Sequence, residues 1–311
     1  MGDHTSRLVP NHDVEWWAKN SYRIIAGKHR LSLVRILKPV TLLLAQTAPK
    51  LLDKERNIKR ISEQAAKARR NNIDILVFPE LHLTGYTMRD EVFTQAEPIP
   101  GPSTKKIERI AKEHGVHIIC GMPEESEVKG VLHNSAIFIG PKGIIGKYRK
   151  VHLPTHTVFE EKRYYRPGQT APVFDTPFGP IGITICYDLY FPELTRLMAL
   201  QGAQLIIAIS ASPSLRRRFF ESFCLSRAME NAVYLAYVNR VGIEEGLQFW
   251  GGSRVVSPSG SVLAQCKYDV EEFQPCKIDL DEVGRSRTFI PTIKDLEPGL
   301  FDLLRTKARE A

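Results

Sequence analysis

Short apolar runs rich in β-branched residues alternate with amphipathic segments from Lys38 onward. An apolar run of about four to eight residues predicts a buried strand, whereas apolar residues three or four apart predict a helix. We therefore expect strands at 40–46, 73–78, 116–121, 132–140, 144–149, 181–185, 203–210 and 234–241. We expect helices at 53–72, 103–114, 191–201, 216–232 and, in the tail, 300–306.

Turn-forming residues mark the ends of several of these elements. Ser103 fits the N-cap of its helix, and Gly115 fits the residue that ends it. Segments 140–143 and 257–260 contain the glycine and proline typical of hairpins. Because hairpins interrupt the alternation of strands with helices, the pattern predicts an α/β fold with partly antiparallel sheets.

Three long connections lack a regular pattern: 81–102, 151–171 and 242–252. Loops of this length in a compact domain tend to carry function. No linker interrupts the chain after Lys38, so we expect one domain over residues 38–285. Residues 1–37 then form an N-terminal extension of unknown role, and residues 286–311 form a C-terminal tail suited to an oligomer contact.

The composition of the chain says more about its binding partners than about its activity. The chain is 43% hydrophobic and 25% charged, as globular proteins are. Its net charge of +8 is spread out, without a long basic tract, a phosphate loop or zinc-finger spacing, so no nucleic-acid partner is expected. No apolar run approaches the roughly 18 residues of a membrane helix, so no membrane partner is expected. Five scattered cysteines without a CxxC pair predict a reducing, cytoplasmic location.

Three reactive side chains each follow directly after an apolar strand: Glu80, Lys150 and Cys186. Sites in α/β sheets lie at the carboxyl ends of strands, so these groups converge if their strands are neighbours in one sheet. A carboxylate would then take the thiol proton, the thiolate would attack a carbon, and the ammonium would hold the developing negative charge. Each residue taken singly also has a structural interpretation. Cys186 fits a core cysteine, Glu80 a solvated acid in a turn, and Lys150 an exposed lysine at a sheet edge.

Cys186 also precedes a helical pattern that Pro192 opens and Gly202 ends. The positive end of a helix dipole favours negative charge nearby. We therefore expect the thiol of Cys186 to ionise more readily than that of a buried cysteine.

The segments around these three residues resemble the motifs of the nitrilase, or carbon–nitrogen hydrolase, superfamily. They are segments 78–86, 148–154 and 186–193, in the order that the family has. The resemblance covers about residues 38–285 and implies a four-layer α-β-β-α sandwich of the nitrilase type with mixed sheets. It also implies that Glu80 is the general base, Lys150 the stabilising cation and Cys186 the nucleophile, without a metal or organic cofactor.

The family carries a second glutamate in the loop after the lysine, and segment 159–168 resembles that loop. Glu161, seven residues before Gly168, matches better than Glu160, which is the alternative. Its implied role is to position the lysine and the substrate nitrogen. The resemblance makes the amide N–H of Tyr187 the second oxyanion donor. The other substrate-binding residues that it implies are Tyr86, Phe159 and Ser212.

Segments 158–165, 209–213, 237–242 and 249–253 resemble the glutaminase domain of glutamine-dependent NAD synthetases. The synthetase domain and its Ser-Gly-Gly-x-Asp-Ser loop do not follow, so we expect a stand-alone amidase. It would hydrolyse a small carboxamide, such as a glutamine-like ω-amide, through a Cys186 thioester and release ammonia. Residues 216–218 are three arginines that open a helix. A solvated face is the favoured interpretation, and binding of a substrate carboxylate is the alternative.

Other functions fit parts of the pattern. A nitrilase or an N-carbamoyl hydrolase would use the same three residues, whereas a papain-like peptidase would pair Cys186 with His82 or His152. A non-catalytic scaffold is a further class. A metal site at His114, His117 and Cys120 is a poor fit, because Gly115 interrupts the helix that would align them.

Members of the family commonly form dimers or larger oligomers through the helices beside the nucleophile, so a homo-oligomer is expected. Some large apolar residues fit either this contact or the core, and the core is the favoured interpretation. They are Met198, Phe219, Phe220, Phe223 and Tyr234.

Overall fold

The computed structural model describes residues 22–27, 30–35 and 38–310. Of the N-terminal extension expected over residues 1–37, it gives an antiparallel ribbon of β1 (Tyr22–Gly27) and β2 (Arg30–Arg35), and the rest lies outside the description. The sequence showed no strand pattern in this extension before Leu31, so β1 was not expected.

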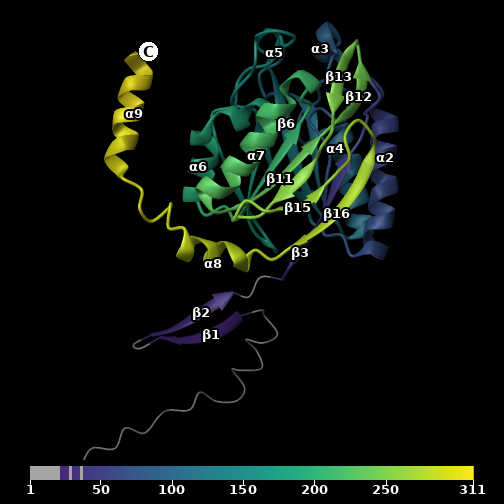
Figure 1. The fold of residues 1–311 in the computed structure, drawn as a ribbon. Helices are drawn as coiled ribbons and strands as arrows, with labels where there is room; N and C mark the ends of the chain where they lie inside the picture. Colours follow the sequence, from purple (N-terminus) through teal and green to yellow (C-terminus); the bar gives the residue numbers. More distant parts are fainter. Residues whose placement is uncertain (1–21, 28–29, 36–37, 311) are drawn as a thin grey trace, which may run out of the picture.

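Two six-stranded mixed sheets form the centre of the molecule (Figure 1). The first has the order β16-β3-β4-β5-β6-β7, and the second has the order β15-β14-β11-β10-β9-β8. The strands of the first sheet are β3 (Val40–Gln46), β4 (Ile75–Val77), β5 (His117–Glu125), β6 (Leu132–Gly140), β7 (Gly143–Arg149) and β16 (Glu272–Ile278). Those of the second sheet are β8 (Val173–Thr176), β9 (Gly179–Ile185), β10 (Leu205–Ser210), β11 (Tyr234–Asn239), β14 (Arg254–Val256) and β15 (Val262–Gln265).

Helices cover the outer face of each sheet, which completes four layers in the order α-β-β-α (Figure 1). The helices on the first sheet are α2 (Lys54–Ala68), followed by a 3₁₀ turn η1 (Arg69–Asn71), and α4 (Pro102–His114). Those on the second sheet are α6 (Pro192–Leu200) and α7 (Arg217–Asn231). This architecture confirms the fold class expected from the sequence.

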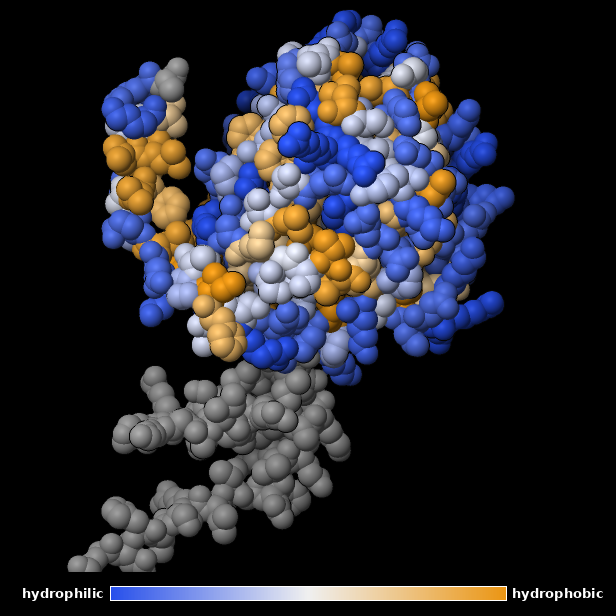
Figure 2. All heavy atoms as spheres, viewed as in Figure 1, coloured by the Kyte–Doolittle hydropathy of each residue, from blue (hydrophilic) through white to orange (hydrophobic). Residues whose placement is uncertain are grey.

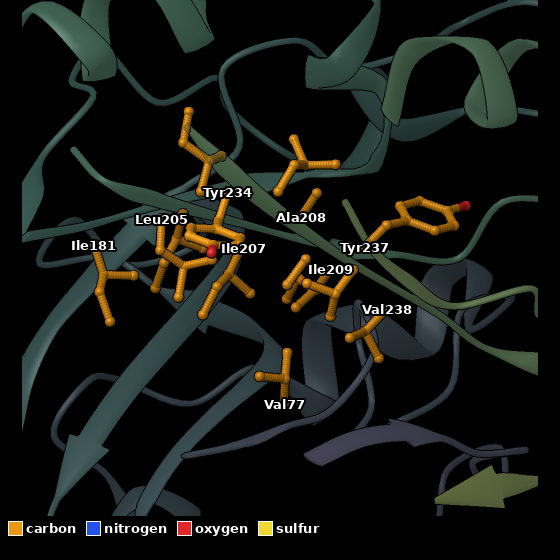
Figure 3. Close-up of a cluster of buried hydrophobic side chains, with 14 of the residues drawn as sticks. Val77, Ile181, Leu205, Ile207, Ala208, Ile209, Tyr234, Tyr237 and Val238 are labelled. Carbon is orange, nitrogen blue, oxygen red and sulfur yellow. The ribbon is translucent and has the colours of Figure 1, made fainter. Parts of the chain in front are cut away.

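Side chains alternate between the two faces of a strand, so each sheet packs against the other sheet on one face and against helices on the other. In β3, Leu42 and Leu44 point into the core between the sheets, whereas Leu43 packs with the outer helices. Figure 3 shows Val77 of the first sheet facing Ile207 and its neighbours on the second. The inter-sheet core therefore fixes the strand ends of the two sheets relative to each other.

Most helix ends follow the capping residues, with one correction. Asp53 caps α2 by accepting from the amide of Arg56, and Gly115 ends α4 in the left-handed conformation. Ser103 was wrongly expected as the N-cap of α4. The cap is Gly101, and the hydroxyl of Ser103 instead donates to Glu97 at 2.9 Å.

The three long connections contain short elements that the sequence pattern did not predict. They are η2 (Arg89–Glu91), α3 (Val92–Gln95), α5 (Glu161–Tyr164) and a hairpin of β12 (Val241–Glu244) and β13 (Leu247–Trp250). Two further 3₁₀ turns, η3 (Cys186–Tyr190) and η4 (Ser214–Arg216), follow β9 and β10. These connections carry much of the site described below.

Helix α8 (Asp281–Phe289) packs against the sandwich through the buried Val283, whereas helix α9 (Pro298–Glu310) lies apart from it (Figure 1). Figure 2 shows hydrophobic residues on α9. Leu300, Phe301, Leu303 and Leu304 on this helix are each more than 40% exposed. Met198, Phe220 and Tyr234 belong to the core, whereas Phe219 is exposed. In the described part of the chain, no helix is both long and apolar enough to span a membrane.

Candidate active site

The ends of three strands bring Glu80, Lys150 and Cys186 together. Glu80 comes shortly after β4, Lys150 directly after β7, and Cys186 directly after β9. The amine of Lys150 lies 2.7 Å from Oε1 of Glu80, and the charges of both residues act on the thiol of Cys186. All three side chains are buried. The sequence argument expected the three groups to converge if their strands were neighbours in one sheet. They converge by another route: β5 and β6 separate β4 from β7 in the first sheet, and β9 belongs to the facing sheet.

The carboxylate of Glu80 is held from both sheets. Its Oε1 accepts from Nδ2 of Asn134 on β6 at 2.7 Å, in addition to the Lys150 amine. Its Oε2 accepts from the backbone amide of Ala211, directly after β10, at 2.7 Å. Sequence reasoning missed Asn134, although an asparagine near the start of an expected buried strand was a signal that a polar partner lies nearby.

Gly121 on β5 allows the Glu80 segment to approach this closely. A Cβ at this position would lie 2.2 Å from the amide nitrogen of Leu81 and 2.7 Å from the Cα of Glu80. Only a residue without a side chain fits such a contact. The position of the candidate base therefore depends on a glycine in the neighbouring strand.

Glu161 is the second carboxylate at the lysine. Its Oε1 lies 2.7 Å from Nζ of Lys150 and accepts from the hydroxyl of Tyr86 at 2.8 Å, whereas the neighbouring Glu160 is exposed. Burial raises the pKa of Glu161 to about 7, the Lys150 amine opposes that rise, and Glu80 adds to it. Burial lowers the pKa of Lys150, but the carboxylates of Glu161 and Glu80 outweigh it and raise that pKa overall, so the amine stays protonated.

Glu244 fixes the loop that carries Tyr86. Its Oε1 accepts from the amides of Tyr86 and Thr87 at 2.8 and 2.7 Å, and its Oε2 pairs with Arg240 at 2.7 Å. The loop reaches this carboxylate through Gly85, which has a φ of +82° and has no room for a Cβ. Sequence reasoning did not identify Glu244, because its partners lie far away in the chain.

The turn at Cys186 has a strained backbone with a φ of +48°. Asp188 stabilises this turn: its Oδ2 accepts from the amide of Ile185 at 3.0 Å and from the hydroxyl of Tyr148 at 2.6 Å. Its Oδ1 accepts from the amide of His152 at 2.9 Å. Asp188 therefore ties the nucleophile segment to the segment that follows Lys150, a role that the sequence did not suggest.

The expectation of a readily ionised thiol was wrong. Burial raises the pKa of the Cys186 thiol well above its ordinary value, the charge of Glu80 adds to this rise, and Lys150 opposes it. Cys186 also lies at the start of the short turn η3, and α6 begins only at Pro192. The thiol therefore keeps its proton and needs a base when it reacts.

Two hollows adjoin this cluster. One of about 10 Å³ is lined by Cys186 together with Tyr187, Phe159 and Ser212, three of the residues expected at the substrate. The other, of about 640 Å³, is lined by Tyr86 and Glu161 among others. The smaller hollow has room for little more than one water molecule, so a substrate needs its lining side chains to move.

The two histidines of the peptidase alternative make other contacts. Nδ1 of His82 lies 3.2 Å from the hydroxyl of Thr47, and burial lowers the pKa of His82 to about 3. The ring of His152 lies 2.9 Å from Asp188 and stacks on Phe191 with ring centroids 3.6 Å apart. Both imidazoles are therefore engaged with residues other than Cys186.

Glu80, Lys150 and Cys186 at strand ends, with Glu161 from the connection after Lys150, form a buried cluster in an α-β-β-α sandwich that is typical of a class of thiol hydrolases. The carbon–nitrogen hydrolase family matches residues 42–288, and the chain belongs to this family. The resemblance noted in the sequence is thereby confirmed at the level of the superfamily.

Several proteins are similar to this chain in sequence or in structure. A nitrilase of Pyrococcus abyssi is 38% identical over 247 residues, which cover 78% of this chain and 90% of the relative. Human omega-amidase NIT2 is 33% identical over 258 residues, which cover 80% and 92% of the two chains. The crystal structure of a carbon–nitrogen hydrolase from Helicobacter pylori G27 has a TM-score of 0.80 at 26% identity and covers 86% of this chain and 98% of its own.

An amidase from Nesterenkonia sp. is also similar in structure, with a TM-score of 0.75 at 26% identity over 90% of this chain and 98% of the amidase. A mutant of the Nesterenkonia sp. AN1 amidase has a TM-score of 0.74 at 25% identity, over 85% of this chain and 95% of its own. That structure contains the acetamide moiety of fluoroacetamide, added covalently at the active-site cysteine.

Proposed function

We propose that this enzyme hydrolyses the C–N bond of a small carboxamide and releases ammonia and a carboxylic acid. The observation that carries the proposal is the buried cluster in which the Lys150 amine contacts Glu80 and Glu161 at 2.7 Å beside Cys186. A carboxylate, an ammonium and a thiol can supply the base, the oxyanion stabilisation and the nucleophile for acyl transfer from nitrogen to sulfur. The omega-amidase and amidase relatives support an amide substrate.

In the first half of the reaction, Glu80 takes the proton of Cys186 as the sulfur attacks the carbonyl carbon of the amide. Because burial raises the pKa of this thiol, the sulfur needs Glu80 as a base when it reacts. Lys150 and the amide N–H of Tyr187 stabilise the negative oxygen of the tetrahedral intermediate. Glu80 then returns the proton to the nitrogen and the C–N bond breaks. Ammonia departs, and the acyl group remains on Cys186 as a thioester.

In the second half, water replaces the sulfur. Glu80 takes one proton from a water molecule while the oxygen attacks the thioester carbon, and the same oxyanion donors hold the second intermediate. The C–S bond breaks, the sulfur recovers its proton from Glu80, and the carboxylic acid leaves. Glu161, which accepts from the hydroxyl of Tyr86, holds the amine of Lys150 in place during both halves.

The experiment that tests the function is an ammonia-release screen over amides, nitriles and carbamoyl compounds. We expect amides to be hydrolysed, with at least about a 10³-fold loss of kcat for Cys186→Ala and for Lys150→Ala. A peptidase would tolerate Lys150→Ala and would cleave peptide substrates. Release of ammonia from nitriles but not from amides would contradict the proposal in favour of a nitrilase, which the Pyrococcus relative supports as the second candidate.

Covalent labelling tests the role of Cys186 separately. By analogy with the Nesterenkonia amidase, fluoroacetamide should add its acetamide moiety to Cys186 and leave Cys224 unmodified. Cys224 is a suitable internal reference because it is a fully buried thiol of the same chain. Intact-protein and peptide mass spectrometry would locate the adduct, and an adduct elsewhere would contradict the assignment of the nucleophile.

We also propose that the enzyme acts as a homo-oligomer in a reducing, cytoplasmic environment. Exposed apolar side chains on α6, α7 and α9, among them Leu197, Phe219 and Leu304, support the assembly. The five cysteines are free and buried in the structure, which supports the reducing compartment.

A further inference from the structure

The strand beside the nucleophile ends in a buried hydroxyl that the reaction above does not use. Ser210 is the last residue of β10, which lies between β9 and β11 in the second sheet. Ile209 pairs with Ile185 in parallel register, so Ser210 and Cys186 are the next residues along two neighbouring strands. Both are buried. The strand pairing therefore places Ser210 beside the residue that carries the reacting sulfur.

The hydroxyl of Ser210 acts on that sulfur. Burial raises the pKa of the Cys186 thiol, and the charge of Glu80 adds to the rise. The Lys150 amine opposes the rise, and so does a hydrogen bond from the Ser210 hydroxyl. A hydrogen bond that opposes the rise is one that favours the negative form of the sulfur. Because Lys150 follows a strand of the first sheet, each sheet contributes one group that stabilises this negative form.

Tyr237 on β11 fixes the direction of the serine hydroxyl. Its own hydroxyl donates to Oγ of Ser210 at 3.3 Å. Burial raises the pKa of Tyr237 well above its ordinary value and the charge of Cys186 adds to the rise, so Tyr237 keeps its proton and stays a donor. A serine hydroxyl has one hydrogen to donate, and Ser210 does not use it toward Tyr237. Within the part of the chain that the structure describes, no oxygen or nitrogen accepts this hydrogen, which leaves the sulfur of Cys186 as its acceptor.

Aromatic neighbours hold Tyr237 itself. Its ring stacks on the rings of Phe220 and Trp250, with centroids 5.5 and 5.8 Å apart. All three rings are buried. Because a buried stack is closely packed, the tyrosine ring cannot turn away without opening the core. The position of its hydroxyl is therefore set before the reaction begins.

We propose that the Ser210 hydroxyl donates a hydrogen bond to the sulfur of Cys186 while the sulfur carries negative charge, and that Tyr237 orients this hydroxyl. The inference rests on the proposed reaction at Cys186. Negative charge develops on the sulfur twice, when Glu80 takes the thiol proton and when the C–S bond of the thioester breaks. A hydrogen bond to a charged atom is stronger than one to a neutral atom, and donation from Tyr237 polarises the serine O–H further. Ser210 is thus a further catalytic residue, and Tyr237 is a positioning residue.

Two substitutions separate these roles, because Ser210→Ala removes the donor and Tyr237→Phe removes only the group that orients it. We expect Ser210→Ala to lower kcat by about 10- to 100-fold with KM little changed, since the lost hydrogen bond is made to charge that develops in the transition state. Tyr237→Phe should lower kcat by about 3- to 10-fold. The double variant should lose no more than Ser210→Ala alone, because Tyr237 acts through Ser210.

The rate at which fluoroacetamide labels Cys186 gives a second readout that does not require amide hydrolysis. The labelling rate constant, followed by mass spectrometry at a fixed pH, should fall in the same order in the three variants. A merely structural role would lower the free energy of unfolding and leave the labelling rate of the folded protein unchanged.

Tyr234→Phe is the matched control. Tyr234 is a buried tyrosine of the same strand, but its hydroxyl donates to Glu282. Its variant should keep the wild-type kcat and the wild-type labelling rate, whatever its effect on stability.

An unchanged labelling rate in Ser210→Ala would overturn the inference. Losses that add in the double variant would also overturn it, because Tyr237 would then act independently of Ser210. If Ser210→Ala does not fold, Tyr237→Phe decides the matter by slowing or not slowing the labelling relative to Tyr234→Phe. Slower labelling in a protein that hydrolyses no amide would support the role of Ser210 and contradict the proposed function.

Discussion

Glu161 is a buried carboxylate that shares its lysine with a second carboxylate, and its protonation should control the site. With a pKa raised from 4.5 to about 7, it is mostly neutral below pH 7 and negative above it. Ionised Glu161 is the form that holds the Lys150 amine in place. We therefore expect kcat/KM to rise with pH through an apparent pKa near 7, measured as a pH–rate profile.

The variant that checks this assignment is Glu161→Gln. It should lose the rise near pH 7 and lower kcat by about 10- to 100-fold. Glu160→Gln is the matched control, because Glu160 is adjacent and exposed. If kcat/KM of Glu161→Gln still rose near pH 7, the titration would belong to another group.

The same pKa shift affects stability. Between about pH 4.5 and 7, the folded protein holds a proton on Glu161 that the unfolded chain has released. The free energy of unfolding should therefore fall as the pH rises through this window, because the raised pKa favours folding only while the group is protonated. Glu161→Gln should flatten this part of the profile in denaturant titrations.

Asp188 acts on the reaction through the backbone that it holds. Asp188→Asn would weaken the hydrogen bonds to Ile185, Tyr148 and His152, so the strained turn at Cys186 would lose its support. We expect kcat to fall at least about tenfold while KM changes little, with a loss of about 2 kcal/mol in the free energy of unfolding. Tyr148→Phe removes one of these bonds and should give a smaller fall in kcat. An unchanged kcat in Asp188→Asn would leave Asp188 a purely structural residue.

Among the elements, β5 sets the distance between the Glu80 segment and the rest of the first sheet. Gly121→Ala would place a Cβ 2.2 Å from the amide nitrogen of Leu81, a contact that only backbone movement can relieve. We expect a loss of about 3 kcal/mol or more in the free energy of unfolding and a severe loss of activity. Chemical denaturation and the ammonia assay would measure both.

Gly284→Ala is the control for this substitution. Gly284 lies on an exposed part of helix α8, and a Cβ there meets no atom within 4 Å. Because alanine has a higher helix propensity, this variant should be unchanged or more stable by about 0.5–1 kcal/mol. Destabilisation of both variants to the same extent would contradict the close-contact argument.

The sequence predicted the long elements well, because their hydrophobic periodicity is strong. Strands β3 and β6 have the bounds expected from the apolar runs, and α4 ends at Gly115 as expected. The hairpin of β12 and β13 was missed, since its short strands have little periodicity and pair mainly with each other. Local patterns therefore determine the layers of the fold but not the connections.

The residues of the candidate site also fall into those that the sequence pattern predicted and those that it missed. Glu80, Lys150 and Cys186 were found because each follows an apolar strand within a recognisable motif. Asn134 and Glu244 were missed because hydrogen bonds between distant segments define their roles. The thiol pKa was predicted in the wrong direction because burial raises it, and burial depends on packing that the sequence does not show.

At the scale of the whole molecule, helix α9 exposes apolar side chains and lies apart from the sandwich (Figures 1 and 2). If a second copy covers them, the wild-type protein should be a dimer or larger at micromolar concentration. Leu300→Glu combined with Leu304→Glu changes two residues on one side of the helix and should reduce the mass measured by analytical ultracentrifugation. Arg309→Glu, on the opposite side, should not. A wild-type monomer would contradict this prediction.

The pairing of β16 with β3 has a consequence for biosynthesis. Val40 at the start of the first sheet lies opposite Ile278, so a nascent chain on the ribosome cannot complete this sheet until almost the whole domain has been translated. Until then β3, an apolar strand, remains an open edge that other chains can pair with. We therefore expect fragments that stop before residue 272 to accumulate as aggregates, and the full chain to depend on chaperones while it is being made.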